Sequence, residues 1–385
     1  MSIQTTNKVT SNDELVEEVL DQFHEPDYES IQGCGDQRRK PDATNIRTRP
    51  ERGFNIPAWD RSNFDHPTVP NCLTHSWDAP GNEDHGGTDW LCTAKPGLGK
   101  SMLANYLSAR LMDINDEKVV WRGSTSRSEW LPLAPWTKLC LPENVDVRVL
   151  ARSRDPREPE VELDIDALEG NIVREVVRYS DPIDLNQNHL DEGQFHVVYP
   201  DPRMRRCQEI YEASDEKAYD TPTGDREALF HEEDPANHWW FAWILARIDH
   251  GPHHWTSFIA DEIGDIAPQS VMKDSFGSYQ KVQLLKDAWV DARKFGLSVF
   301  AFGHSEKDIH SMIRRKIRWR VQLRGSANPT TANDVLGFSS VKMNHDLTSN
   351  MDVGEALLYS ESSFDRFAWK DMPAPTDYKL KIKLE

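Results

Sequence analysis

The residues most suited to chemistry form a short glycine-rich segment that ends in a lysine and a serine. Residues 94–101 read Ala-Lys-Pro-Gly-Leu-Gly-Lys-Ser. Gly97 and Gly99 let the backbone turn with its N–H groups pointing inward, where they can hold an anionic phosphate. Lys100 can reach the β- and γ-phosphates of a nucleotide, and the hydroxyl of Ser101 can ligate Mg²⁺. The sequence therefore predicts ATP and Mg²⁺ as cofactors; a chance Gly-Lys-Ser before a helix is the alternative.

The flanking sequence supports a phosphate-binding loop. Residues 89–93 predict a short buried strand, and apolar residues from position 102 to 111 recur at helical spacing. The loop would then lie at a helix N-terminus, which attracts anions. Its first position is Ala where the strictest form of the pattern has Gly. The predicted cofactor-binding residues are Ala94, Lys95, Pro96, Gly97, Leu98, Gly99, Lys100, Ser101 and Met102.

Two adjacent carboxylates follow an apolar run about 160 residues later. Residues 255–260 read Trp-Thr-Ser-Phe-Ile-Ala, which predicts a buried strand, and Asp261 and Glu262 come directly after it. In a parallel sheet, the carboxyl end of this strand lies beside the phosphate loop. Asp261 would hold Mg²⁺ directly or through water, and Glu262 would polarise the attacking water. An acidic turn without a catalytic role is the alternative.

Two further segments contain catalytic candidates. Residues 297–302 predict the next buried strand, and His304 after its end could sense the γ-phosphate, with Ser305 as second choice and an ordinary loop histidine as the alternative. In residues 314–324, six of eleven residues are basic and apolar residues alternate with polar ones, which predicts a strand with one buried and one cationic face. Arg320 could act as an arginine finger on a neighbouring subunit's ATP, or contact a phosphate backbone. A charged edge strand is the alternative.

Helices and apolar strands alternate along most of the chain. This order predicts an α/β fold with a mostly parallel central sheet flanked by helices. Residues 1–85 are polar and predict an N-terminal extension that is partly disordered, with a short helix at 13–23. Residues 86–385 are expected to form one P-loop ATPase domain. An acidic region is inserted in it at about 151–235, where acidic residues outnumber basic ones more than twofold.

The composition of the whole chain is acidic. The formal net charge is −19, and only 18 of the 45 basic residues are Lys. Carboxylates hold water and long lysine stems expose apolar area, so this pattern favours a halophilic source over an ordinary acidic cytoplasmic protein. It argues against attraction of the whole surface to nucleic acid, although a local basic lining stays compatible with it. Five scattered cysteines, a polar N-terminus and no long apolar run predict a soluble cytoplasmic protein without disulfides or a transmembrane segment.

The order of these segments resembles the FtsK/HerA superfamily of P-loop ATPases, which includes DNA pumps and viral or plasmid packaging motors. Residues 94–101 look like the Walker A motif of that family. Residues 258–262 look like its Walker B motif, with Glu262 as the catalytic acid. Residues 299–304 are similar to the sensor strand, and His304 stands where the family usually has Gln. Residues 317–323 resemble the strand that carries a family arginine, here Arg320.

The resemblance covers about residues 88–370 and implies a RecA-like core. Residues 330–337 resemble the family's late helix, which leads to a final Gly-containing strand, here 354–359. The resemblance also implies a homo-oligomer in the form of a hexameric ring, and ATP-driven movement of double-stranded DNA. Together with the scarcity of Lys, it suggests a haloarchaeal protein of a virus or plasmid, located in the host cytoplasm or associated with the virion.

Three functions stay open at this point. The first is an ATP-hydrolysing motor that translocates DNA or packages a genome. The second is a secretion- or pilus-type ATPase that handles protein and shares much of the same core. The third is a nucleotide-dependent partition or switch protein with slow hydrolysis. Glu262 favours a true hydrolase over a passive nucleotide binder.

Overall fold

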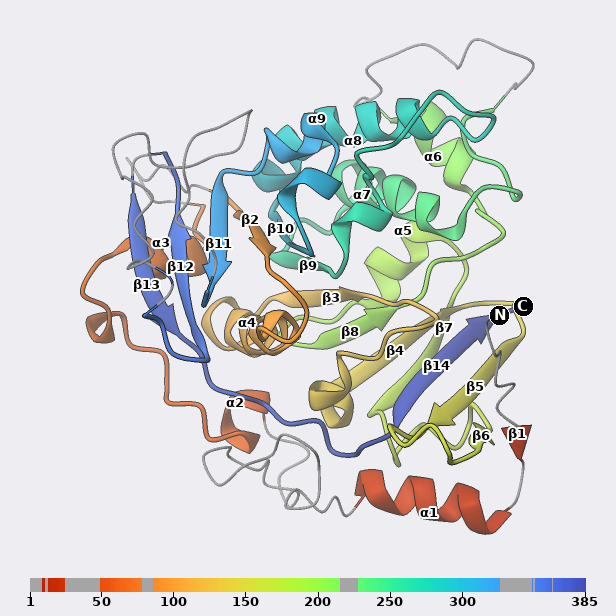
Figure 1. Ribbon diagram of the computed structural model, residues 1–385. Helices are drawn as coiled ribbons and strands as arrows, with labels where there is room; N and C mark the ends of the chain where they lie inside the picture. The colour runs from red at the N-terminus through yellow and green to blue at the C-terminus, as the bar shows by residue number, and fades with distance from the viewer. Residues whose placement is uncertain are drawn as a thin grey trace, which may run out of the picture.

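The computed structural model describes residues 9–10, 13–24, 49–77, 86–214, 228–325, 348, 350–361 and 363–385 (Figure 1). Within these ranges the strands form a central sheet of ten and a second sheet of four. The central sheet has the spatial order β13 (Phe364–Ala368), β12 (Glu355–Tyr359), β11 (Trp319–Leu323), β2 (Asp89–Thr93), β10 (Leu297–Gly303), β9 (Thr256–Ala260), β3 (Lys118–Arg122), β8 (Phe195–Val198), β4 (Thr137–Pro142) and β7 (Glu175–Tyr179).

The central sheet is mostly parallel. All pairings from β11 through β2, β10, β9, β3, β8 and β4 to β7 are parallel, and only β12 and β13 join antiparallel. Strands covered on both faces are rich in apolar residues, and β9 and β10 are buried at every position. The prediction of an α/β fold with a mostly parallel central sheet flanked by helices is confirmed.

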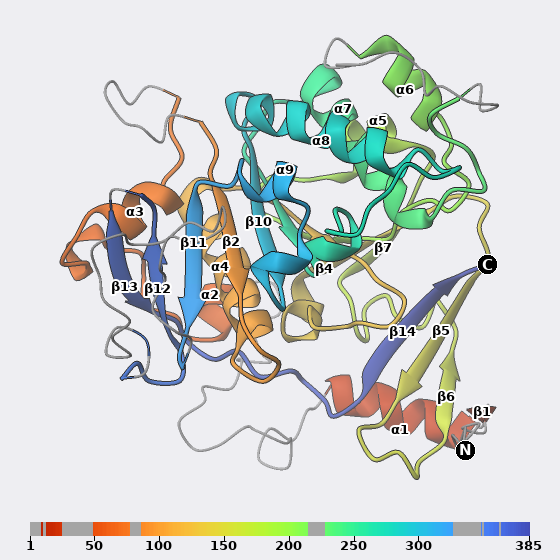
Figure 2. The ribbon, with the colours of Figure 1, turned by 45° about the horizontal axis from the view of Figure 1, so that its top comes forward.

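Helices cover both faces of this sheet (Figure 2). Along β3, Val119 packs in the same apolar cluster as helix α4 (Lys100–Asn115). The next residue, Val120, packs on the other side with α7 (Trp239–His250) and α8 (Ser278–Ala292). The shorter helices are α2 (Pro50–Gly53), α3 (Thr68–Leu73), α5 (Pro182–Asp184), α6 (Cys207–Ala213) and α9 (Ser311–Arg314).

Part of the predicted polar extension packs against the rest of the chain. Helix α1 (Asp13–His24) covers the predicted helix at 13–23 and contacts β6, and its residues Val19 and Phe23 are buried in the main apolar cluster. A second sheet lies nearby, with the order β1 (Val9–Thr10), β6 (Glu160–Leu163), β5 (Val147–Arg152) and β14 (Lys379–Leu384). Strand β1 pairs with β6, and β14 pairs with β5. Segments near both ends of the chain are therefore joined to strands from its middle.

The acidic region at 151–235 contributes to the interior of the fold. Strand β8 belongs to this region, and it lies between β3 and β4 in the central sheet. Strand β7 forms one edge of the same sheet. Strand β8 contains no acidic residue and β7 contains only Glu175, so most acidic residues of this region lie outside these two strands.

Strand β11 differs from the prediction of one buried and one cationic face. It lies between β2 and β12, so neither of its edges is free, and side chains on both of its faces are buried, including Arg320 at 4% exposure. The charge of Arg320 is compensated by Glu306, whose Oε1 accepts from Nε at 2.7 Å. The edge-strand alternative is wrong for the same reason. Alternation of residue types predicted the strand, but not that its second face would be covered.

Two remaining expectations concern the end of the chain and membranes. The helix predicted at 330–337 lies outside the described residues, whereas β12 matches the strand predicted at 354–359. In the part of the chain that the structure describes, no helix is both long and apolar enough to cross a bilayer.

Candidate nucleotide site

The phosphate loop joins the end of β2 to the start of α4. Gly97 and Gly99 have φ angles of 82° and 92°, the left-handed region that glycine adopts without a steric cost. A Cβ at Gly97 would meet nothing, so the backbone conformation alone requires glycine there. At Gly99 a Cβ would also lie 3.2 Å from Cζ2 of Trp369. The loop therefore has the local conformation that its sequence predicted.

The Lys100 amine lies over this loop. Its Nζ donates to the carbonyl of Ala94 at 2.6 Å and lies 3.3 Å from Nδ1 of His304. Partial burial lowers the pKa of Lys100, and the charge of Asp261 opposes that shift. Burial also raises the pKa of the neighbouring Cys92 thiol to about 12, so this thiol is neutral at physiological pH. Asp261 is therefore the anion that the lysine faces.

Strand register brings the two acids to the same edge of the sheet as the loop. Ala301 of β10 lies opposite Leu91 of β2 on one side and Ala260 of β9 on the other. The residue after Ala260, Asp261, is then level with the last residues of β2, directly before the loop. The amide of Ala94 also donates to the carbonyl of Gly303, which ties the loop to β10. This is the carboxyl edge of the parallel strands, where ligands of α/β sheets bind.

The two carboxylates differ in environment. Desolvation by burial raises the pKa of Asp261. The positive charges of Arg127, Arg122 and Lys100 oppose this shift. Glu262 has a φ of 53°, a left-handed conformation that costs a residue with a Cβ roughly 1–2 kcal/mol. Such strain persists only where surrounding contacts enforce it, and it is concentrated at functional sites. The backbone of Glu262 is therefore held by its surroundings in a conformation that it would not adopt freely.

His304 connects the lysine to the glutamate. Its Nε2 lies 3.1 Å from Oε1 of Glu262, and its Nδ1 faces Lys100. A protonated lysine can only donate, so Nδ1 must accept and Nε2 must carry the hydrogen that Glu262 accepts. The structure thus brings together four residues singled out by the sequence: Lys100, Asp261, Glu262 and His304.

Two arginines that the sequence analysis missed complete this cluster. Arg127 lies in the loop after β3, with Nη1 3.0 Å from Oε1 of Glu262 and 3.8 Å from Oδ2 of Asp261. Arg122, at the end of β3, donates from Nη1 to the carbonyl of Asp261 at 2.6 Å and from Nη2 to Asp265 at 3.0 Å. Arg122 has a sequence signal, since it directly follows the apolar run at 119–121. Arg127 belongs to no motif, so its place in the site could not be predicted from the sequence.

Arg320 lies apart from this cluster. Its guanidinium donates to Glu306 and to the carbonyls of Ile317 and Arg314, at 2.7, 2.5 and 2.7 Å. With these bonds and 4% exposure, it is engaged inside its own subunit. The geometry therefore gives no support to Arg320 as a finger on a neighbouring nucleotide.

The donor set fits Mg²⁺ better than a metal held wholly by protein. Among the described residues, no group of three or more His, Cys, Asp or Glu side chains could hold a metal ion. Mg²⁺ keeps several waters and uses one or two carboxylates together with substrate phosphates. Ser101, in the first turn of α4, and Asp261 offer one hydroxyl and one carboxylate at the same sheet edge.

Comparison with known proteins gives distant structural likenesses only. No protein-family model and no curated protein matches the sequence. The genome packaging NTPase B204 from Sulfolobus turreted icosahedral virus 2, in complex with ATP-gammaS, is similar at 11% identity and a TM-score of 0.37, over 74% of this chain and 98% of that one. VirB4 of Thermoanaerobacter pseudethanolicus is similar at 12% identity and a TM-score of 0.41, over 78% and 93%. At these values, the fold assignment rests on the sheet and the loop described above.

Proposed function

We propose that this protein binds ATP with Mg²⁺ and hydrolyses it to ADP and phosphate. The observation that carries the proposal is the meeting of Lys100, His304 and Glu262 at the carboxyl edge of β2, β10 and β9. In this proposal the backbone N–H groups of residues 94–102 hold the phosphates, and Lys100 exchanges the Ala94 carbonyl for phosphate oxygens. Ser101 and Asp261 hold Mg²⁺, which when bound offsets charge on the phosphates.

Glu262 acts on water in this scheme. Its carboxylate accepts a hydrogen bond from the attacking water and orients it in line with the γ-phosphate. Arg127 and His304 fix its position, since both contact Oε1. His304 also contacts Lys100, so movement of the lysine onto phosphate is transmitted to the residue that meets the water. This pairing is how His304 would sense the γ-phosphate.

A finer assignment follows from the order of motifs. The resemblance to the FtsK/HerA superfamily supports a hexameric motor that moves double-stranded DNA in translocation or genome packaging. The abundance of carboxylates and scarcity of Lys support a halophilic archaeal source, with the protein in the host cytoplasm or a virion. Both parts of this assignment rest on the sequence.

The test is ATP turnover by the purified full chain with Mg²⁺ in high salt, with and without duplex DNA. Lys100→Ala should abolish nucleotide binding or turnover, and Glu262→Gln should bind ATP but hydrolyse it at least roughly a hundredfold more slowly. Lys307→Ala removes one exposed charge outside the site and serves as the control. Unchanged turnover in Lys100→Ala would remove the loop assignment. Stimulation by DNA supports a DNA motor, and its absence favours a protein-handling ATPase.

A further inference from the structure

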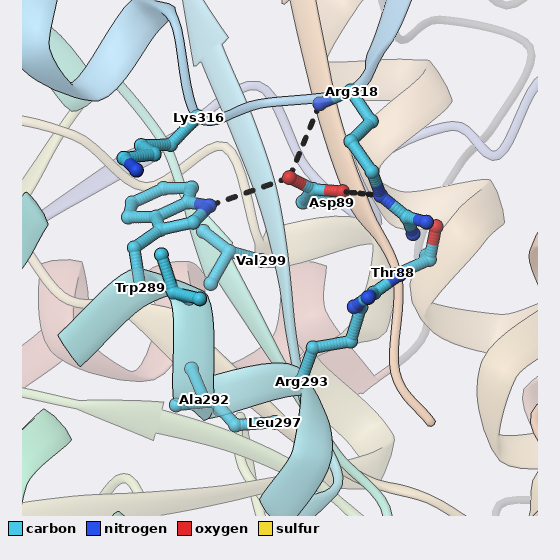
Figure 3. A pocket seen from close by; sticks show the side chains of 10 residues that line it. Thr88, Asp89, Trp289, Ala292, Arg293, Leu297, Val299, Lys316 and Arg318 are labelled. Carbon is cyan, nitrogen blue, oxygen red and sulfur yellow. Dashed lines mark hydrogen bonds and ion pairs between the residues drawn. The ribbon is translucent and has the colours of Figure 1, made fainter. Parts of the chain in front are cut away.

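The basic stretch at 314–324 divides between the protein interior and the lining of a cavity. Arg320 and Arg314 are buried, at 4% and 7% exposure. Lys316 and Arg318 instead line a cavity of about 140 Å³ (Figure 3). Thr88 and Asp89 line it at the start of β2, and Leu297 lines it at the start of β10. Since the strands are parallel, this cavity lies at the amino edge of the sheet, opposite the nucleotide site.

The lining of this cavity is cationic although the protein is strongly acidic. Its charged members are Arg293, Lys316, Arg318 and a single carboxylate, Asp89. Asp89 is buried and accepts from Nε and the backbone N–H of Arg318 at 3.0 and 3.1 Å, and from Nε1 of Trp289 at 3.4 Å. Its charge therefore offsets that of Arg318. Lys316 is exposed and forms no ion pair with the described residues.

The size of the cavity limits its ligand. Sites for whole small molecules usually measure roughly 300–1,000 Å³, well above the 140 Å³ found here. One anionic group fits this space, but a nucleotide does not. Lys316 and Arg318 come from the segment before β11 and Arg293 from the turn after α8, and all three line the cavity (Figure 3). Planar guanidinium groups and a lysine are the side chains that bind phosphate oxygens.

An exposed aromatic stack adjoins the same turn of the chain. Trp77 is 40% exposed and stacks on Trp255, with ring centroids 4.1 Å apart and planes 16° apart. Both rings lie against Gly296, next to cavity residue Leu297, and the carbonyl of Arg293 accepts from the amide of Gly87. Flat aromatic faces beside a cationic groove are how proteins bind strands with unpaired bases. Neither a free phosphate nor an acidic peptide contains a base that could stack on these rings.

We infer that this amino-edge cavity binds a backbone phosphate of a nucleic acid, with Trp77 contacting an adjacent base where bases are unpaired. This site rests on the proposed movement of DNA and adds a surface for contact with nucleic acid on the face opposite the ATP site. Lys316 and Arg293 line the cavity and supply positive charge to the phosphate backbone there, and the pairing of Asp89 with Arg318 holds the Arg318 guanidinium in place. Because the surface is remote from Lys100 and Glu262, nucleic-acid binding here requires no ATP turnover.

The experiment measures binding of fluorescent DNA by anisotropy, without nucleotide, over a series of KCl concentrations. One arm uses a duplex and the other a single strand of the same length. Lys316→Glu should weaken binding to both by about tenfold and reduce the slope of log K against log salt by about 1, as expected for one lost phosphate contact. Trp77→Leu should weaken only single-strand binding. Arg157→Glu is the matched control, because Arg157 is 88% exposed and pairs locally with Asp155.

Each outcome decides the inference. Absence of salt-dependent DNA binding by the unmodified chain overturns it, as does equal binding by Lys316→Glu and Arg157→Glu. Displacement of DNA by inorganic phosphate at equal phosphate concentration would show a site for free phosphate, and displacement by polyglutamate at equal charge would show a site for acidic protein. Basal ATP turnover should be the same in Lys316→Glu as in the unmodified chain. Loss of turnover in Lys100→Ala with DNA binding retained separates this inference from the proposed hydrolysis.

Discussion

The Oε1 atom of Glu262 lies 3.0 Å from Nη1 of Arg127, while the backbone of Glu262 holds a φ of 53°. The ion pair and the strained backbone belong together, because a left-handed glutamate must be held by contacts that offset its cost. Arg127 comes from the loop after β3 and Glu262 from the end of β9, and these strands are neighbours in the sheet. The position of the proposed catalytic carboxylate therefore depends on a residue that no motif contains.

Arg127→Ala should slow ATP turnover by roughly tenfold to a hundredfold, the usual cost of removing a residue that orients a catalytic group. The affinity for ATP should change much less, because Arg127 contacts the acids and not the loop. Steady-state kinetics and equilibrium nucleotide binding would separate the two effects. Equal loss of affinity and turnover would mean instead that Arg127 acts on the nucleotide itself.

His304→Gln should retain more turnover than His304→Ala. A glutamine offers one acceptor and one donor group, so it can accept from Lys100 and donate to Glu262 as the histidine does. Alanine offers neither, so the link between lysine and glutamate is lost while the loop stays intact. The measurement is kcat at saturating ATP. Equal kcat values for the two variants would show that the bridge has no role in turnover.

Arg320→Ala should destabilise the single subunit, by about 3–5 kcal/mol, because it leaves the nearly buried Glu306 without its partner. A finger acting between subunits would instead leave the folded subunit intact and impair only the assembled enzyme. Urea unfolding under conditions that keep the protein monomeric distinguishes the two. Glu306→Gln is a useful companion, since it keeps the shape of the contact but removes its charge. An unchanged midpoint in Arg320→Ala contradicts a structural role.

Asp261→Asn should raise the free energy of unfolding at neutral pH in the absence of nucleotide. Burial raises the pKa of Asp261 in the folded state, so the ionised carboxylate opposes folding at every pH above its unfolded pKa. The gain should shrink as pH falls toward that unfolded value, because the native carboxyl then takes up a proton. Thermal unfolding at neutral and mildly acidic pH measures it. The same variant should lose Mg²⁺-dependent turnover, and a destabilised Asp261→Asn at neutral pH would contradict the burial argument.

Local sequence was sufficient for several elements of the fold and site. The glycines of residues 94–101 require positive φ, and the apolar runs before Asp261 and His304 are long enough to be buried strands. Each of these features depends on contiguous residues, so it can be predicted without knowing its neighbours. Parallel order then follows from the alternation of strands with helices. The location of both acids at the carboxyl edge was therefore predictable.

Only the tertiary structure decided which strand lies beside which. Strand β10 lies between β2 and β9, and this order puts His304 between Lys100 and Glu262. The same sheet buries β11 on both faces and turns Arg320 inward toward Glu306, so a stretch expected to present a cationic face contributes to the core. Pairing and burial arise between segments far apart in the chain. Sequence periodicity reports which residues can be buried, whereas the packing of the whole sheet determines what covers them.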